Sequence, residues 1–121
     1  MQVNAIICEE ISKDIGSVGL QQIELPEPGP GQVRIRLKAC AVNFPDLLMI
    51  QGKYQFKPPL PFAPGGEAAG DIEACGPGVS FKEGDAVIVG MRYGGFAEAV
   101  VVDESQVKPL PNGMSYAKGA S

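Results

Sequence analysis

Four polar residues stand among apolar neighbours in the 121-residue sequence and are the first candidates for chemistry: Asn43, Asp46, Tyr54 and Glu67. Asn43 and Tyr54 each carry a neutral hydrogen-bond donor, and such donors can polarise a carbonyl group without a metal ion. Each residue also has a plainer interpretation. Asp46 could be a first-turn acid favoured by a helix dipole, Asn43 a turn residue, Tyr54 a rim aromatic, and Glu67 structural.

The sequence contains no His, which excludes Ser/His/Asp triads, Cys/His dyads and His-ligated zinc or non-haem iron. Cys8, Cys40 and Cys75 have no CxxC spacing. They therefore predict neither a disulfide framework nor a zinc knuckle, and each is interpreted as a small buried hydrophobe. The pairs Gly65–Gly66 and Gly94–Gly95 match no phosphate-binding pattern, and we expect turn or close-packing glycines there.

The composition is that of a globular domain with many turns. Hydrophobic residues make up 45% and charged residues 20%, and 16 Gly and 11 Pro are spread along the chain. The length allows one domain. The net charge of −4 argues against nucleic acid and anionic membrane surfaces as partners. Residues 1–10 lack a basic leader pattern and no apolar run reaches the roughly 18 residues of a membrane span, so we expect a soluble, cytoplasmic protein.

Short strands are the main elements that must position the polar residues. The clearest runs over residues 33–40, where Val33, Ile35, Leu37 and Ala39 alternate with polar residues or Cys. Further strands are predicted at residues 2–7, 20–25, 67–74, 86–89, 96–102 and 106–110. Six or seven short strands with few helices favour a small barrel or sandwich.

One short helix should lie next to the candidate residues. Pro45 is suited to its first turn and Gly52 follows its end, which predicts a helix over residues 45–51. Asn43 precedes this helix and Tyr54 follows it. Residues 57–66 contain four prolines and cannot join a central sheet, because proline removes ladder donors, so they are predicted to form an extended loop.

Several weak motifs follow one another in a fixed order over nearly the whole chain: Pro28-Gly29-Pro30-Gly31-Gln32-Val33, Ala41 to Asp46, Gly52-Lys53-Tyr54, Pro61 to Gly65, Glu67-x-x-Gly70, Lys82-x-Gly84-Asp85-x-Val87 and Gly95 to Glu98. In this order the sequence resembles the medium-chain dehydrogenase/reductases, specifically the zinc-free quinone oxidoreductase branch that includes the zeta-crystallins. The resemblance implies a mainly β, GroES-like, partly open β-barrel with one or two short helices, which forms one wall of an active-site cleft.

Two departures from the zinc alcohol dehydrogenase branch are informative. That branch carries a Cys ligand where this sequence has Asn43, and a His ligand where it has Gly66. The Cys-rich loop that binds structural zinc is also missing. The resemblance therefore implies that no zinc is bound and that hydrogen-bond donors take over the role of the Lewis acid.

The resemblance also implies a set of site residues. Asn43 and Tyr54 would be the catalytic hydrogen-bond donors, and Asn43 and Asp46 would lie against the cofactor, with Asp46 ordering the loop. The wall of the substrate pocket would be formed by Phe44, Met49, Tyr54 and Phe62.

The activity implied by the resemblance is NADPH-dependent reduction of quinones or α,β-unsaturated carbonyls by hydride transfer. A Rossmann domain is expected after Ser121 and would hold most of the cofactor. Residues 1–121 would then be the N-terminal catalytic domain of a longer, homodimeric oxidoreductase, inactive as a fragment. An alternative from another class stays open: a free-standing GroES-like module that binds a protein or peptide and catalyses nothing.

Overall fold

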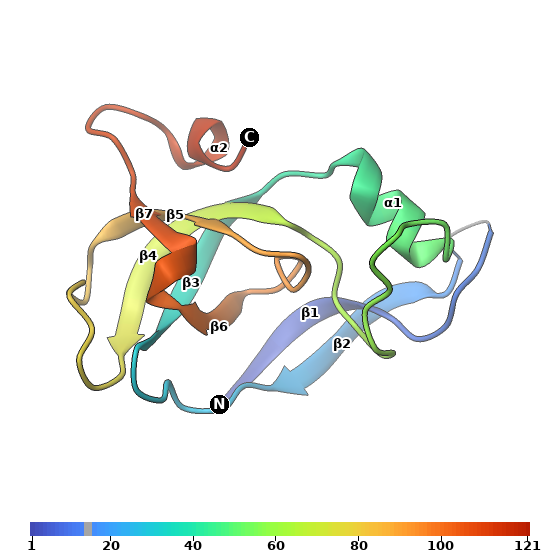
Figure 1. Ribbon diagram of the computed structural model, residues 1–121, viewed down its shortest axis with the longest axis horizontal. Helices are drawn as coiled ribbons and strands as arrows, with labels where there is room; N and C mark the ends of the chain where they lie inside the picture. Colours follow the sequence, from blue (N-terminus) through green and yellow to red (C-terminus); the bar gives the residue numbers. More distant parts are fainter. Residues whose placement is uncertain (14–15) are drawn as a thin grey trace.

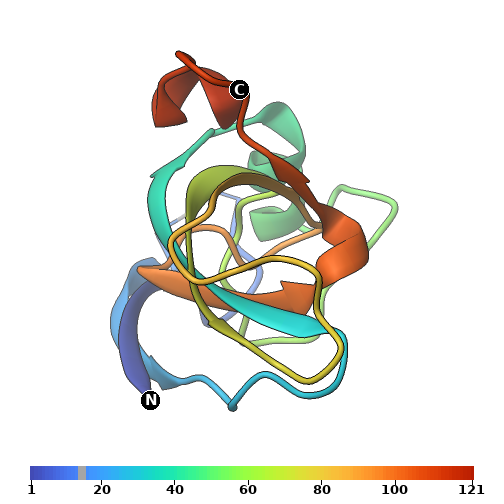
Figure 2. The same cartoon turned by 90° about the vertical axis from the view of Figure 1, so that its left-hand side faces the viewer.

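The structure, a computed structural model, describes residues 1–13 and 16–121 and consists mainly of two antiparallel sheets (Figure 1). Strands β1 (Gln2–Cys8) and β2 (Val18–Glu24) form a hairpin. The second sheet has five strands in the order β6-β3-β4-β5-β7. Their bounds are β3 (Gln32–Cys40), β4 (Glu67–Cys75), β5 (Ala86–Gly90), β6 (Ala99–Asp103) and β7 (Val107–Pro109). The strongly curved sheets do not close into one barrel (Figure 2), which confirms the prediction of a mainly β, partly open fold.

The alternation in β3 separates a core face from a polar face. Val33 and Ile35 are fully buried. On the other face, the Arg34 and Arg36 guanidinium groups lie 2.7 and 2.9 Å from the carboxylate of Glu73 in β4. Partial burial opposes the charged form of Glu73, but the hydrogen bonds and charges of both arginines outweigh it and lower the pKa of Glu73. This face is therefore stabilised by an ion-pair network.

Two clusters of apolar side chains form most of the core. The larger one lies inside the five-stranded sheet and consists chiefly of β-branched residues, which suit a pleated surface: Val33, Ile35, Ala68, Ile72, Val87, Val89, Val100, Val102 and Val107. The smaller one comprises Cys8, Met49, Ile50 and Phe62. It connects helix α1 (Phe44–Ile50) to the hairpin and to the proline-rich loop.

The hairpin reaches the larger sheet through residues 96–98. The Ile6 amide donates to the Phe96 carbonyl at 2.7 Å, and the Glu98 amide donates to the Asn4 carbonyl at 2.9 Å. A strand was predicted over residues 96–102, but β6 begins only at Ala99. The difference arises because residues 96–98 pair locally with β1, through an isolated bridge between Ala5 and Ala97.

A 3₁₀ turn, η1 (Glu104–Gln106), and a short helix, α2 (Tyr116–Gly119), complete the chain. Helix α2 lies against β3 and β4, and the Tyr116 hydroxyl donates to the Asp71 carboxylate at 2.6 Å. No helix within the described residues has the length and apolar character needed to cross a membrane.

The three cysteines differ in burial. Cys8 is fully buried and Cys40 is partly buried, but Cys75 is exposed. The prediction of a buried hydrophobe is thus wrong for Cys75, because this residue ends β4 at the turn that begins with Gly76.

Candidate functional site

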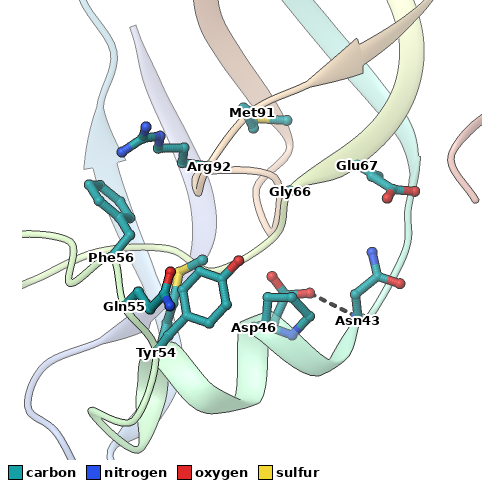
Figure 3. A pocket seen from close by; sticks show the side chains of 11 residues that line it. Asn43, Asp46, Tyr54, Gln55, Phe56, Gly66, Glu67, Met91 and Arg92 are labelled. Atoms are coloured by element: carbon teal, nitrogen blue, oxygen red, sulfur yellow. Dashed lines mark hydrogen bonds between the residues drawn. The ribbon is translucent and has the colours of Figure 1, made fainter.

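A cavity of about 600 Å³ opens beside α1 (Figure 3). Three separate parts of the chain surround it: both ends of α1, the start of β4 and the loop after β5. The lining residues are Asn43, Pro45, Asp46, Met49, Tyr54, Gln55, Phe56, Gly66, Glu67, Met91 and Arg92. A volume of this size is in the range that accepts a small organic ligand.

The first turn of α1 supplies Asn43 and Asp46. Asn43 is the N-cap, in extended backbone conformation, and Pro45 lies in the first turn, where its fixed φ suits a helix start. The Asp46 carboxylate is 2% exposed and accepts the Asn43 amide at 2.8 Å and the Gly65 amide at 3.1 Å. Asp46 therefore fastens the end of the proline-rich loop to the start of the helix.

The C-terminal end of α1 positions Tyr54. Gly52 has φ +72°, and the Lys53 amide donates to the Leu48 carbonyl at 2.8 Å, which reverses the chain directly after the helix. The Tyr54 ring packs against the cluster beneath α1, and its hydroxyl points towards the middle of the cavity (Figure 3). Asn43 lies just before the helix and Tyr54 shortly after it. Because this seven-residue helix is only about 10 Å long, both residues line the same cavity.

Gly66 lines the cavity across from the helix, and closely packed glycines surround it. A Cβ atom on Gly66 would lie 2.9 Å from the Met91 carbonyl oxygen, and one on Gly65 would lie 2.8 Å from the Phe96 amide nitrogen. The Gly95 amide donates to the Gly65 carbonyl at 3.0 Å. Gly65, Gly66 and Gly95 thus serve close packing, and Gly94 has φ +113°, so the prediction of turn or close-packing glycines is confirmed.

Negative charge gathers at the Asn43 end of the cavity. Burial, reinforced by the charges of Asp46 and Glu67, raises the pKa of the Cys40 thiol to about 11. Cys40 therefore stays protonated and unreactive at neutral pH. Glu67 is exposed at the mouth and points, with Asn43, towards the same side of the cavity (Figure 3).

Aromatic side chains define the other end. The Arg92 guanidinium carbon lies 4.6 Å from the centre of the Phe56 ring. Phe56 stacks on Tyr93, and Tyr93 meets Phe62 edge to face. Sequence reasoning missed Phe56 and Arg92. The one available signal was a cation two residues before the Gly94–Gly95 pair, and no local pattern indicates that it lines the same cavity as Tyr54.

The structure brings together four of the residues predicted for the site: Asn43, Asp46, Met49 and Tyr54 line one cavity. Phe44 and Phe62 do not line it. Phe44 is 71% exposed on the outer side of α1, and Phe62 is buried in the cluster below the helix. The described residues contain no group of three or more His, Cys, Asp or Glu side chains arranged to hold a metal ion.

Comparison with known proteins places this geometry in context. Residues 29–112 match the family model of the alcohol dehydrogenase GroES-like domain. The synaptic vesicle membrane protein VAT-1 homolog of Rattus norvegicus is 46% identical over 97 residues, which cover 79% of this chain and 24% of that protein. The quinone oxidoreductase-like protein 2 homolog of Nematostella vectensis is 35% identical over 119 residues, covering 97% of this chain and 32% of that protein.

A solved structure agrees with these matches. The quinone oxidoreductase of Pseudomonas syringae pv. Tomato DC3000 superposes with a TM-score of 0.88 at 31% identity, over 98% of this chain and 36% of that one. The chain thus spans about a quarter to a third of the length of the curated relatives described above.

Proposed function

The chain belongs to the alcohol dehydrogenase GroES-like domain family of the medium-chain dehydrogenase/reductases, and on this premise we propose that it is the substrate-side domain of an NADPH-dependent, zinc-free reductase of quinones or α,β-unsaturated carbonyls. One observation carries the proposal. Two neutral hydrogen-bond donors, Asn43 and Tyr54, reach one cavity from the two ends of α1. Relatives of this chain whose names refer to quinone oxidoreductases support the choice of acceptor.

The residues at the Asn43 end fit a nicotinamide group. The side-chain amide of Asn43 offers both a donor and an acceptor, which matches a carboxamide. Pro45 and Met49 line the same cavity as Asn43, so they provide an apolar surface for one face of a ring. When bound there, NADPH would supply the hydride. The choice of NADPH over NADH follows the zinc-free branch that the sequence resembles.

Tyr54 and Asn43 would act on the oxygen of the acceptor. As the acceptor gains a hydride, negative charge develops on its carbonyl oxygen, and a proton completes the reduction to the enol or the hydroquinone. Donors held in place before the reaction stabilise such a charge without reorganising. Tyr54 is held by packing against the cluster beneath α1, and Asn43 is held by its backbone hydrogen bond to Asp46.

Asp46 would be a positioning residue. Its carboxylate is buried and already accepts two backbone amides, from Asn43 and from Gly65. These bonds fix the N-cap of α1 relative to Gly65 and therefore set where the Asn43 side chain stands. Its contribution to catalysis would be indirect, through the geometry of Asn43.

The test uses the full-length protein that carries this domain. NADPH oxidation is followed at 340 nm with 1,4-benzoquinone and with 4-phenylbut-3-en-2-one. We expect turnover of at least one, and a loss of about tenfold to a hundredfold in kcat/KM for Tyr54→Phe and for Asn43→Ala. Tyr116→Phe removes the same hydroxyl group from α2, far from the cavity, and should change kcat/KM less than twofold. A folded protein that reduces neither compound would overturn the proposal.

A further inference from the structure

Arg92 is a cation on the wall of the cavity that the proposed reaction does not use. It lies in the loop after β5, in the same cavity as Tyr54 and Asn43. The salt bridges among the described residues involve Met1, Arg34 and Arg36 as cations, and Arg92 takes part in none of them. An exposed guanidinium in a cavity, in a chain of net charge −4, is therefore open to an anion from outside the chain.

The Arg92 guanidinium group contacts an aromatic ring, and within residues 1–13 and 16–121 its N–H donors make no hydrogen bond or ion pair. Its carbon lies over the Phe56 ring, 4.6 Å from the ring centre, in a cation–π contact. Phe56 in turn stacks on Tyr93 at 5.9 Å, and Tyr93 contacts the buried ring of Phe62 at 6.1 Å. A row of three rings thus anchors Arg92 to the core. A guanidinium in a cation–π contact keeps its N–H donors, which suit bidentate binding of a carboxylate.

The charges of the cavity are separated between its two ends. Arg92 and Phe56 lie on one side, whereas Glu67, Asp46 and Asn43 lie on the other (Figure 3). An anionic group would be attracted to the Arg92 end and repelled from the Asp46 end. A ligand with a negative group at one end would therefore enter in one orientation, with its neutral end towards Asn43 and Tyr54.

We propose that Arg92 selects acceptors that carry a carboxylate at the end remote from the carbonyl oxygen on which negative charge develops. The inference rests on the proposed function, because it names the class of acceptor that this same site prefers. Arg92 would be a specificity residue: it would bind the charged end and so orient the acceptor, while Tyr54 and Asn43 act on the reacting oxygen.

The test compares two acceptors that differ in one group, 4-phenylbut-3-en-2-one and its para-carboxylate, in the full-length protein. The native protein should favour the carboxylate by about fivefold or more in kcat/KM at low salt. Arg92→Gln should remove the preference, so that its loss in kcat/KM is about fivefold or more larger for the carboxylate than for the neutral compound, and Arg92→Lys should retain part of the preference. Lys57→Gln removes an exposed cation outside the cavity lining and should leave the preference intact.

Two results would overturn the role of Arg92. One is the same preference in the native protein and in Arg92→Gln, or no preference in either. The other is an equal loss for both compounds in Arg92→Gln, which would mean that Arg92 only holds Phe56 in place.

A binding measurement separates this inference from the proposed reaction. Amide NMR shifts of the 121-residue chain, titrated with each compound, require no turnover. Tighter binding of the carboxylate that is lost in Arg92→Gln would uphold the role of Arg92 even if neither compound is reduced. Reduction of both compounds without any charge preference would uphold the reductase and reject the role of Arg92.

Discussion

Replacing Asp46 by Ala should destabilise the domain far more than its size suggests. The carboxylate is 2% exposed and accepts two backbone amides, one from Asn43 at 2.8 Å and one from Gly65 at 3.1 Å. Alanine offers neither amide a partner. A buried donor left without an acceptor costs about 1–3 kcal/mol, so the two together should cost about 2–4 kcal/mol, since the Asn43 amide is only partly buried.

That loss is a large share of the total. A domain of this size is typically stable by about 5–15 kcal/mol, and a loss of 2–4 kcal/mol lowers Tm by roughly 10 °C or more. The matched control is Asp85→Ala. The Asp85 carboxylate accepts one backbone amide, from Lys82 at 2.9 Å, in an exposed turn where water can replace it. We expect that variant to lose less than about 1 kcal/mol.

Urea unfolding at pH 7, followed by far-UV circular dichroism, measures both free energies. Hydrogen exchange of the Gly65 amide adds a local measurement and should accelerate in Asp46→Ala but not in Asp85→Ala. Equal free energies of unfolding for the two variants would refute the reasoning. So would a Gly65 amide that stays as protected as in the native chain, because the bond from Gly65 to Asp46 is what couples the loop to α1.

Two further predictions concern the larger sheet. Glu73→Gln should lower the free energy of unfolding by up to about 1 kcal/mol at pH 7. The pKa of Glu73 is lowered in the folded state, so this loss should be complete above the ordinary glutamate pKa of about 4.3. It should vanish as the pH falls through the folded-state pKa. Urea unfolding of both proteins across this range would contradict it if the difference did not change with pH. Gly70→Ala should cost at least about 3 kcal/mol or prevent folding, because its Cβ would lie 2.1 Å from the Arg36 carbonyl oxygen. Gly90→Ala, with no atom within 4 Å of its Cβ, should stay within about 0.5 kcal/mol, and similar Tm values for these two variants would reject the argument.

The strands could be predicted wherever one face of the sheet is buried. Alternation predicts a strand at residues 33–40, and the observed strand β3 is Gln32–Cys40. The strand predicted at residues 67–74 corresponds to β4, Glu67–Cys75. A one-residue shift in such a strand would expose its whole apolar set, so the pattern fixes the register. Residues 96–98 show the limit of this reasoning. The apolar side chains of Phe96 and Ala97 suit a strand, yet the partner of this segment is β1, some 90 residues earlier, and no local pattern identifies it.

The same limit applies to the cavity. Asn43 and Tyr54 flank one short helix, so knowing that helix is enough to predict that they lie together. Arg92 comes almost 40 residues later and reaches the cavity through contacts between the loop after β5 and the start of β4. The Met91 amide donates to the Gly66 carbonyl at 2.8 Å, and this bond fixes the loop. Such a contact depends on the packing of the whole sheet.

Helix geometry explains why residue type alone was a poor guide to the pocket wall. Asp46 and Met49 are three residues apart and lie on the face of α1 that meets the cavity. Phe44 precedes Asp46 by two residues, which is about 200° around a helix, so its ring lies on the opposite side, 71% exposed. Phe44 is apolar and adjacent to Asn43, yet it lies outside the cavity, whereas the charged Arg92, in the loop after β5, lines it. Arg92 lines the cavity because its loop is positioned there, and its charge then decides what the cavity can bind.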